Sequence, residues 1–416
     1  MSMYPRLPFA LLCSALLSTP LHGQLVSDTI QAIQAIQAIE SLTVSEADLS
    51  MDAVYNRPVS QKTTNQMAMG GYLEINSLVS NLDGLVEGPT MQARRMTLFM
   101  ASSISSRLKF LSEVEFEEGG HEINIEFAAV DLTLHPLLTI RAGIITNPIG
   151  SFNQNHDGPK WHFIERPDMA SSLLPATWSN AGMGVHGKAG SGKWLFGYEA
   201  YLSSGFDASI IDNTMSRTYL PAAKANANRF EEGEHLLFTG KLVLKHPLVG
   251  EWGLSMMTGA YNDWKLEGMM VDDKRLVKVL ALDWHLRMSR GTDIRAELAS
   301  IAVDVPSSYG QQYGSQQSGV FIDVVQPLFI GKVLSWSDAV LSAAIRLDWV
   351  DWNQGQFVET GDNIADDLWA ITPALTFKPS AETVIRLNYR RQAQRDIFSN
   401  PAAQGASWML GLSTYF

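Results

Sequence analysis

The chain has 416 residues, of which 46% are hydrophobic, and a formal net charge of −12 from 31 basic and 43 acidic residues. This acidic balance argues against a nucleic-acid partner, because such a partner is held by basic surfaces. No stretch reaches the roughly 20 consecutive apolar residues that a membrane-spanning helix needs, so the hydrophobic residues must serve a soluble core or membrane-spanning strands.

Residues 1–23 are predicted to be a secretory signal peptide. Arg6 supplies the positive charge, residues 7–17 are mostly apolar, and residues 18–23 include small residues. We expect cleavage after Gly23. The single cysteine of the sequence, Cys13, lies within this peptide. We therefore expect an exported chain without disulfide bonds, whose stability comes from backbone pairing and packing.

Residues 24–66 are predicted to form a periplasmic N-terminal segment. Isoleucine recurs there every three residues, at Ile30, Ile33, Ile36 and Ile39. Such a stripe drifts around a helix of 3.6 residues per turn, so the repeat is not a coiled-coil heptad. A short helix or a flexible lead-in is one interpretation of the segment, and a small self-association element is the other.

From residue 67 to residue 416 the hydrophobic period is two, which indicates strands with one apolar and one polar face. In 341–349, for example, Leu347 and Trp349 alternate with Arg346 and Asp348. About sixteen such segments are expected, starting near residues 70, 92, 107, 121, 137, 182, 193, 234, 251, 274, 292, 319, 339, 365, 382 and 406.

The connections between these segments alternate between short turns and long loops, which is typical of an up-and-down membrane barrel. The sequence therefore predicts an all-β fold, a transmembrane antiparallel up-and-down β-barrel. Aromatic residues near the ends of the apolar faces fit the interfacial girdles of such a barrel: Trp252, Trp284, Trp349, Trp369, Tyr389 and Trp408. The opposite faces carry charges of both signs, which suits a wet lumen.

The long loop at 149–180 is dense in aromatic and charged residues, and loops of this length without secondary structure are usually functional or disordered. We expect it to fold into the lumen as a constriction loop formed by Lys160, Trp161, Glu165 and Arg166. An external cap on the rim is the alternative. The same loop contains His156, Asp157 and His162, so a metal site there is a further, weaker interpretation.

The charged residues of the predicted polar faces nearly balance in sign. The candidate pore-lining residues are Arg95, Arg107, Lys109, Glu113, Glu115, Arg141, Asp283, Arg287, Arg295, Glu297, Asp323, Arg346, Asp348, Arg386 and Arg390. Some lie close along one strand, such as Arg295 with Glu297 and Arg346 with Asp348. We expect most of them to form a wall of paired charges, and a ladder that binds substrate is the alternative.

The final strand is predicted to place Trp408, Leu410, Leu412 and Phe416 on the lipid face. A terminal phenylalanine on such a strand resembles the assembly signal that the outer-membrane barrel-assembly machinery reads. This strand must pair with the first one, near residues 70–76, because an open sheet edge would leave unpaired backbone groups in hydrocarbon.

Several short motifs resemble the phosphate-selective porin O and P family: Gly71–Glu74, Ala128–Leu132, Leu138–Gly150 and Ala200–Gly205. The resemblance covers roughly residues 68–416. It implies a sixteen-stranded outer-membrane channel that is commonly a homotrimer. The phosphate-selective members have a ladder of arginines with lysine clusters, whereas the predicted lumen here is nearly neutral, so the ion preference stays open.

We therefore expect a porin of the bacterial cell outer membrane that allows passive diffusion of small hydrophilic solutes or ions, with anions such as phosphate among the candidates. The alternative is a plugged outer-membrane barrel whose extracellular loops bind a surface ligand or partner. A soluble exported β-sandwich or an enzyme is a third class. Residues 187–193 match a phosphate-binding loop only in part, because Trp194 replaces the Ser or Thr.

We expect no enzymatic activity, cofactor or metal ion. The expected partners are outer-membrane lipid and lipopolysaccharide, the barrel-assembly machinery, small hydrophilic solutes and further copies of the chain.

Overall fold

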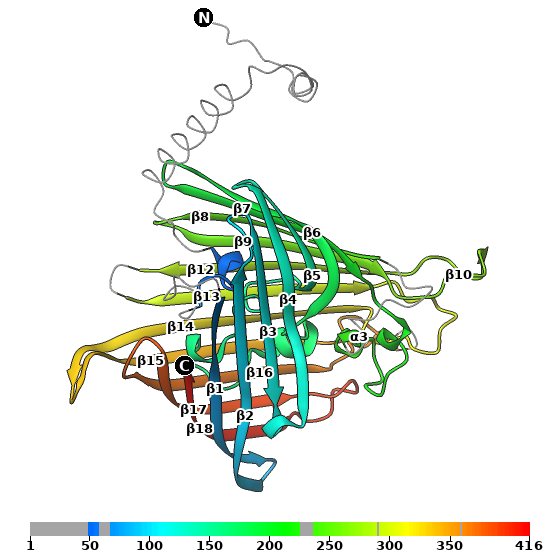
Figure 1. Ribbon diagram of the computed structural model, residues 1–416. Helices are drawn as coiled ribbons and strands as arrows, with labels where there is room; N and C mark the ends of the chain where they lie inside the picture. The colour runs from blue at the N-terminus through cyan, green and yellow to red at the C-terminus, as the bar shows by residue number, and fades with distance from the viewer. Residues whose placement is uncertain (1–48, 58–66, 225–235, 289–290, 358–359) are drawn as a thin grey trace, which may run out of the picture. The chain divides into compact units, whose positions relative to one another are not determined.

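The computed structural model describes residues 49–57, 67–224, 236–288, 291–357 and 360–416. The predicted signal peptide and the isoleucine repeat lie outside these residues. Sixteen of the described strands form one closed barrel, in which neighbours in the sequence pair with each other and the first strand pairs with the last (Figure 1). The predicted fold class, an antiparallel up-and-down barrel, is confirmed. The barrel belongs to a compact unit that comprises residues 48–189 and 194–416.

The barrel strands are β1 (Met67–Leu82), β2 (Leu85–Ser103), β3 (Leu108–Glu117), β4 (Glu122–His135), β5 (Leu138–Thr146), β6 (Ser179–Ser191), β7 (Trp194–Ser204), β8 (Leu236–His246), β9 (Gly250–Ala260), β12 (Leu276–Arg287), β13 (Asp293–Val303), β14 (Gln316–Val333), β15 (Trp336–Asp351), β16 (Asp367–Lys378), β17 (Thr383–Gln394) and β18 (Ala403–Tyr415). A small separate hairpin consists of β10 (Lys265–Leu266) and β11 (Met269–Met270).

The helical pieces are short: the 3₁₀ turns η2 (Ser50–Asp52), η3 (Glu118–Gly120), η4 (Gly158–Lys160) and η6 (Ala208–Ile210), the π-helical turn η5 (Met169–Leu173) and the α-helix α3 (Pro221–Lys224). No helix among the described residues is long and apolar enough to cross a bilayer.

The final strand shows how the period of two is used. On β18, Trp408 and Leu410 are exposed on the outside, whereas Met409 and Ser413 are buried on the inside. Successive side chains of a strand point to opposite faces, so an alternating sequence gives one apolar outer face and one polar or small inner face. The predicted face of the terminal strand is thus the observed outer face.

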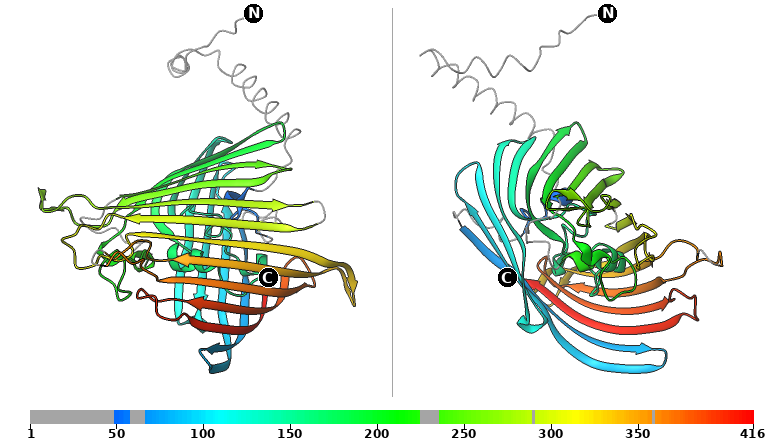
Figure 2. Two further views of the ribbon diagram at one scale, coloured as in Figure 1. Left: turned by 180° about the vertical axis from the view of Figure 1, so that it is seen from behind. Right: turned by 90° about the vertical axis from the view of Figure 1, so that its right-hand side faces the viewer.

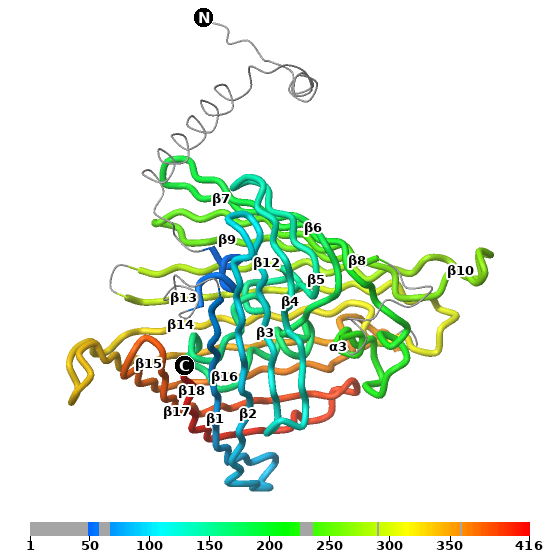
Figure 3. The backbone as a smooth tube through the Cα atoms, viewed as in Figure 1, coloured from blue at the N-terminus to red at the C-terminus, as the bar shows by residue number. Residues whose placement is uncertain are grey.

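The barrel closes where β1 meets β18, which lie side by side in Figure 3. Tyr72 is opposite Tyr415 and Asn76 is opposite Gly411. At the end of this pairing, the Phe416 N–H donates to the Gly71 carbonyl (3.0 Å) and the Gly71 N–H donates to the Phe416 carbonyl (3.2 Å). The predicted pairing of the terminal strand with residues 70–76 is confirmed.

The two rims of the barrel differ in their connections. One rim has short turns, such as the one between β8 and β9, and the other has the long loops, such as the one between β5 and β6. The first two connections on the long-loop rim are exceptions. The β3–β4 connection is residues 118–121, and in the β1–β2 connection Asp83 and Gly84 form a two-residue turn with positive φ angles of 49° and 93°. That geometry is typical of a tight hairpin.

Aromatic residues pair across strands on the outer face near both rims. Trp252 stacks on Trp284 with ring centroids 5.5 Å apart, and the N–H groups of both indoles donate to the Val249 carbonyl of the β8–β9 turn. Near the opposite rim, the ring centroids of Trp349 and Trp369 are 5.8 Å apart. Such bands are where aromatic girdles meet the two membrane interfaces.

Part of the barrel interior is a dry hydrophobic core, which the expectation of a wet lumen did not include. Met169 and Leu173 of the β5–β6 loop are fully buried in one cluster with Val277 and Val279 of β12 and Ile301 of β13. The inward-facing residues at the long-loop ends of β12 and β13 are apolar, so they exclude water when the loop packs on them.

Candidate functional site

The loop at 147–178 lies inside the barrel and hydrogen-bonds to inward-facing residues on several sides of the wall (Figure 2). The Phe152 N–H donates to the Glu297 carboxylate of β13 (3.0 Å), and the Arg386 guanidinium of β17 donates to the Phe163 carbonyl (2.9 Å). Buried backbone groups need partners, and the charged inner faces of the strands provide them for this irregular segment.

The first two predicted constriction residues lie in the middle of this loop. Lys160 forms an ion pair with Asp157 (2.9 Å). The Trp161 ring is 6% exposed, packs on Phe152 with ring centroids 4.6 Å apart, and has the Arg295 guanidinium 4.8 Å from its centroid. Trp161 is therefore held between an aromatic ring and a cation.

The other two predicted constriction residues face β2 and β3. Both Glu165 carboxylate oxygens accept from Arg94, at 2.9 and 3.0 Å, while Arg166 donates to the Ala176 carbonyl (2.5 Å) and lies 3.8 Å from Glu115. Partial burial raises the pKa of the Glu165 carboxyl, but the Arg94 guanidinium lowers it more, so the net shift is downward and Glu165 is charged at neutral pH.

Arg94 is not among the predicted pore-lining residues, because strict alternation of faces places it on the outer face of its strand. The register of β1 with β2 shifts between Glu74 and Ile75, so that Glu74 is opposite Arg95 and Ile75 is opposite Ala93. Arg94 is the extra residue of this β-bulge, and a bulge breaks the strict alternation of faces. Two successive arginines therefore reach the loop from one strand.

Two cavities lie on either side of the loop. One of 510 Å³ is lined by residues of the β8–β9 turn and by Trp161, and one of 460 Å³ is lined by Arg95, Arg166 and Arg390 nearer the long-loop rim. Between them lies a space of about 10 Å³ that shares Trp161 with the first cavity and Arg95 and Arg166 with the second. That volume is on the order of one water molecule, so these residues form the narrow point between the two cavities.

Of the fifteen candidate pore-lining residues, eleven are buried on the inner face: Arg95, Glu113, Glu115, Arg141, Asp283, Glu297, Asp323, Arg346, Asp348, Arg386 and Arg390. Lys109 is exposed, and Arg295 and Arg287 have side chains 25% and 71% exposed. Arg107 is a correction, because it lies in the β2–β3 turn with an exposed side chain, where Ser105 Oγ accepts its N–H (3.3 Å).

The buried charges are paired between different strands, either neighbours or strands one further apart. Arg346 of β15 donates to both carboxylate oxygens of Asp323 on β14, at 2.6 and 2.7 Å, and Arg386 donates to Glu74 of β1 at 2.8 Å. The pairings expected along one strand were wrong. Arg346 and Asp323 are directly opposite each other in the ladder, and opposite residues are closer than residues two apart on one strand.

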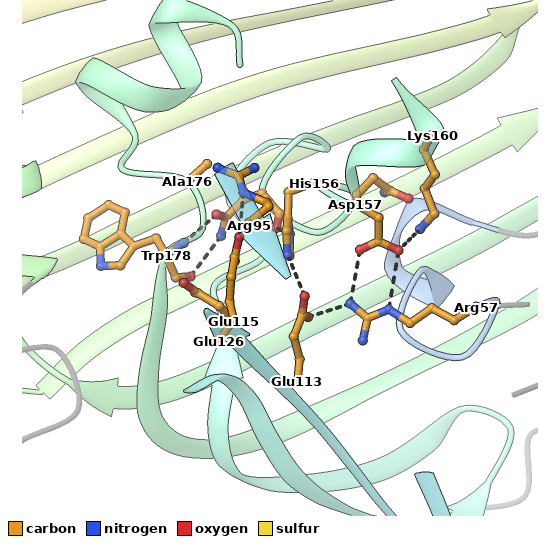
Figure 4. A network of polar contacts seen from close by, with 12 residues as sticks. Arg57, Arg95, Glu113, Glu115, Glu126, His156, Asp157, Lys160, Ala176 and Trp178 are labelled. Atoms are coloured by element: carbon orange, nitrogen blue, oxygen red, sulfur yellow. Dashed lines mark hydrogen bonds and ion pairs between the residues drawn. The ribbon is translucent and has the colours of Figure 1, made fainter. Parts of the chain in front are cut away.

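Residues 49–57, which were assigned by sequence to the periplasmic segment, also lie inside the barrel. Arg57 forms ion pairs with Glu113 (2.5 Å) and Asp157 (3.2 Å) (Figure 4). Tyr55 donates a hydrogen bond to Asp131. The segment has no regular period, so the sequence held no signal for this position.

No protein-family model matches the chain. An uncharacterized protein of Aquifex aeolicus (strain VF5) is 30% identical over 239 residues, which are 55% of this chain and 51% of that protein. The chain thus spans about half the length of the curated relative that it matches.

Solved structures with the same fold are bacterial porins and channels. The anion-selective porin from Comamonas acidovorans has a TM-score of 0.51 at 10% identity, covering 84% of this chain and 99% of that one. The outer-membrane channel DcaP of Acinetobacter baumannii has a TM-score of 0.51 at 11% identity, covering 85% and 99%. The chain has the fold of an outer-membrane porin. At these identities the likeness concerns the fold alone.

One group of side chains in the porin-like barrel has the composition of a metal site. Glu113, Glu115 and His156 each offer a ligand atom, and these atoms all lie within 4.8 Å of one another. However, Arg57 lies 2.5 Å from Glu113 and Arg95 lies 2.8 Å from Glu115, so two guanidinium groups already neutralise the carboxylates. The group is therefore better described as part of an ion-pair network.

The pKa values of the two loop histidines are shifted in opposite directions. Burial lowers the pKa of His156, but the Glu113 carboxylate raises it more, so its net shift is upward. Burial and the neighbouring Lys378 ammonium lower the pKa of His162 to about 3, and His162 is therefore neutral at neutral pH. Among the described residues, neither histidine lies in a set of free neighbouring ligands such as a His-based metal site has.

Proposed function

We propose that this chain is an outer-membrane channel for the passive diffusion of small hydrophilic solutes or ions. The observation that carries the proposal is the arrangement of two cavities, of 510 and 460 Å³, on either side of a narrow point formed by one loop. Passage requires Trp161 or Arg166 to move, because about 10 Å³ cannot hold a hydrated ion. We propose no enzymatic activity.

Anions are the solutes that the cavity nearer the long-loop rim favours. Four arginines line it, Arg94, Arg95, Arg166 and Arg390, against the acidic Glu165 and Asp168. Guanidinium groups bind phosphate and carboxylate oxygens well. The phosphate-selective family that the sequence resembles and the anion selectivity in the name of the Comamonas porin agree with this preference. We further propose a homotrimer in contact with outer-membrane lipid and lipopolysaccharide.

The burial of the inward-facing charges favours a second candidate function. Eleven candidate pore residues are buried beneath the loop and the 49–57 segment, as in a plugged barrel whose external loops bind a ligand or partner.

Conductance across a planar bilayer separates the two functions. We expect discrete channel openings for the full chain and a higher conductance for a variant lacking residues 153–168. The reversal potential across a salt gradient then gives the ion preference, and anion selectivity is expected. Folded protein that gives no current, with or without residues 153–168, would support the plugged barrel instead.

A further inference from the structure

The guanidinium group of Arg57 fills a cage inside the barrel. Its Nη2 atom lies 2.5 Å from Glu113 Oε2 and 3.2 Å from Asp157 Oδ1, and its Nε donates to Asp157 Oδ2 at 3.4 Å. Figure 4 shows Arg57 between the two carboxylates, which come from β3 and from the β5–β6 loop. The guanidinium carbon is 3.6 Å from the centroid of the Phe99 ring. The cage thus combines two carboxylates with one aromatic face.

The residues that form the cage are also held in place by contacts with barrel residues other than Arg57. Tyr415 of β18 donates to Asp157 Oδ2 (2.8 Å), and the Phe99 ring packs against Tyr415 and Tyr72, with centroids 6.4 and 5.9 Å away. These rings form one buried cluster at the seam of the barrel. The walls therefore belong to the barrel and its loop, and the only part contributed by residues 49–57 is the cation inside them.

Residues 49–57 attach to the barrel through both apolar and polar contacts. Leu49 and Met51 are buried, and Val54 and Tyr55 pack against a hydrophobic cluster of the wall. The Ser50 N–H donates to Glu251 of β9 (2.7 Å), Lys188 of β6 pairs with Asp52 (3.1 Å), and Tyr55 contacts Asp131 and Arg141. The segment forms no strand and adds no backbone ladder to the sheet. Its removal therefore leaves the backbone pairing of the barrel intact.

The cage has a chemical preference. Lys160 also pairs with Asp157 (2.9 Å) and His156 contacts Glu113 (3.2 Å), but each of them reaches one carboxylate only. A planar guanidinium can donate to both carboxylates while its flat face lies on an aromatic ring. An ammonium group is a point charge and matches this geometry less well.

We propose that Phe99, Glu113 and Asp157 form a guanidinium-binding site for solutes, which Arg57 occupies in this structure, and that residues 49–57 are consequently a displaceable plug. The plug role rests on the proposed channel function: a guanidinium-bearing solute would compete with Arg57 for the site and thereby loosen the plug. The binding site itself does not depend on conduction.

Arginine binding by isothermal titration calorimetry tests the site on the purified, folded full chain. The Arg57→Gln variant vacates the cage, so it should bind free L-arginine at least about tenfold more tightly than the unchanged protein does. Citrulline has the same shape without the charge and should not bind measurably. Adding Glu113→Gln to Arg57→Gln should remove arginine binding. Arg57→Lys keeps the charge of the plug and serves as a second variant should Arg57→Gln not fold.

Current recordings with the same proteins test the plug. Arg57→Gln should conduct at least about twofold more than the unchanged chain, and a peptide of residues 49–57 should block that current, whereas the peptide carrying Gln in place of Arg57 should not. Arginine binding that is the same in Arg57→Gln and in the unchanged protein would overturn the site, even if both conduct. Binding as expected without any current would instead refute the channel function and leave the site intact.

Discussion

Arg346 illustrates how single residues decide the character of the lumen. Its guanidinium donates to both oxygens of Asp323 and to the Glu165 carbonyl (2.8 Å), and its carbon lies 4.2 Å from the Phe163 ring centroid. Every face of this buried cation therefore has a partner. Charges removed from water need such complete pairing, which explains why loop residues and wall residues meet at the same points.

Replacing Arg346 by Met should destabilise the folded barrel by about 3–5 kcal/mol, because Asp323 would remain buried without its cation. Denaturant unfolding in detergent micelles measures this change. The matched control is Arg287→Met, since Arg287 pairs with Asp293 but is 71% exposed, and such a pair contributes less than about 1 kcal/mol. Adding Asp323→Asn to Arg346→Met should recover part of the loss. Equal losses for Arg346→Met and the control would contradict the argument.

At the scale of elements, the strands and the inward position of the 149–180 loop could be predicted from the sequence, whereas the partners of that loop and the position of residues 49–57 could not. Most expected strand starts agree with the structure because lipid and lumen impose opposite polarities on alternate residues: residue 137 was expected and Leu138 begins β5. The larger error is at β2, expected near residue 92 and beginning at Leu85, because residues 85–93 are exposed on both faces and do not alternate in burial.

The interior depends on contacts between residues that are distant in sequence. Arg57 meets Asp157, one hundred residues away, and nothing local in either segment records the other. The sequence predicted that the loop around Trp161 folds into the lumen and that most wall charges are paired, but it did not predict the individual partners. Which charges pair depends on strand register and on the bulge at Arg94, and both are properties of the assembled sheet.

The terminal strand supports a prediction of its own. Deleting Phe416 removes the two hydrogen bonds with Gly71 at the end of the β1–β18 seam. It also removes the terminal phenylalanine that we expect the assembly machinery to read and leaves the buried Tyr415 as the last residue. We expect several-fold less assembled barrel in the outer membrane at unchanged synthesis, measured by heat-dependent mobility on gels. Phe398→Ala is the control, because Phe398 is an exposed aromatic residue outside the strands. An unchanged amount of assembled barrel would contradict the prediction.

At the scale of the whole barrel, the two rims differ in the length of their connections and in the segments that lie near them. The seam between β1 and β18 ends at the short-turn rim, where Gly71 meets Phe416, and residues 49–57 contact the inner wall near the same rim through Glu251 and Lys188. Long connections such as 352–366 gather at the other rim. Short turns on the periplasmic side and long loops outside are typical of outer-membrane barrels, so this asymmetry orients the barrel in the membrane.

The orientation can be tested with single cysteines at the two rims. Phe398, between β17 and β18, is 69% exposed at the long-loop rim, and Leu248, in the β8–β9 turn, is 78% exposed at the short-turn rim. A membrane-impermeant maleimide should label Phe398→Cys in intact cells and Leu248→Cys only after the outer membrane is opened, because the narrow point beside Trp161 excludes a reagent of that size. Both variants should react equally in detergent, which controls for reactivity. Labelling of Leu248→Cys alone in intact cells would show that the barrel has the opposite orientation in the membrane. Residues 49–57 would then close the lumen from the opposite side.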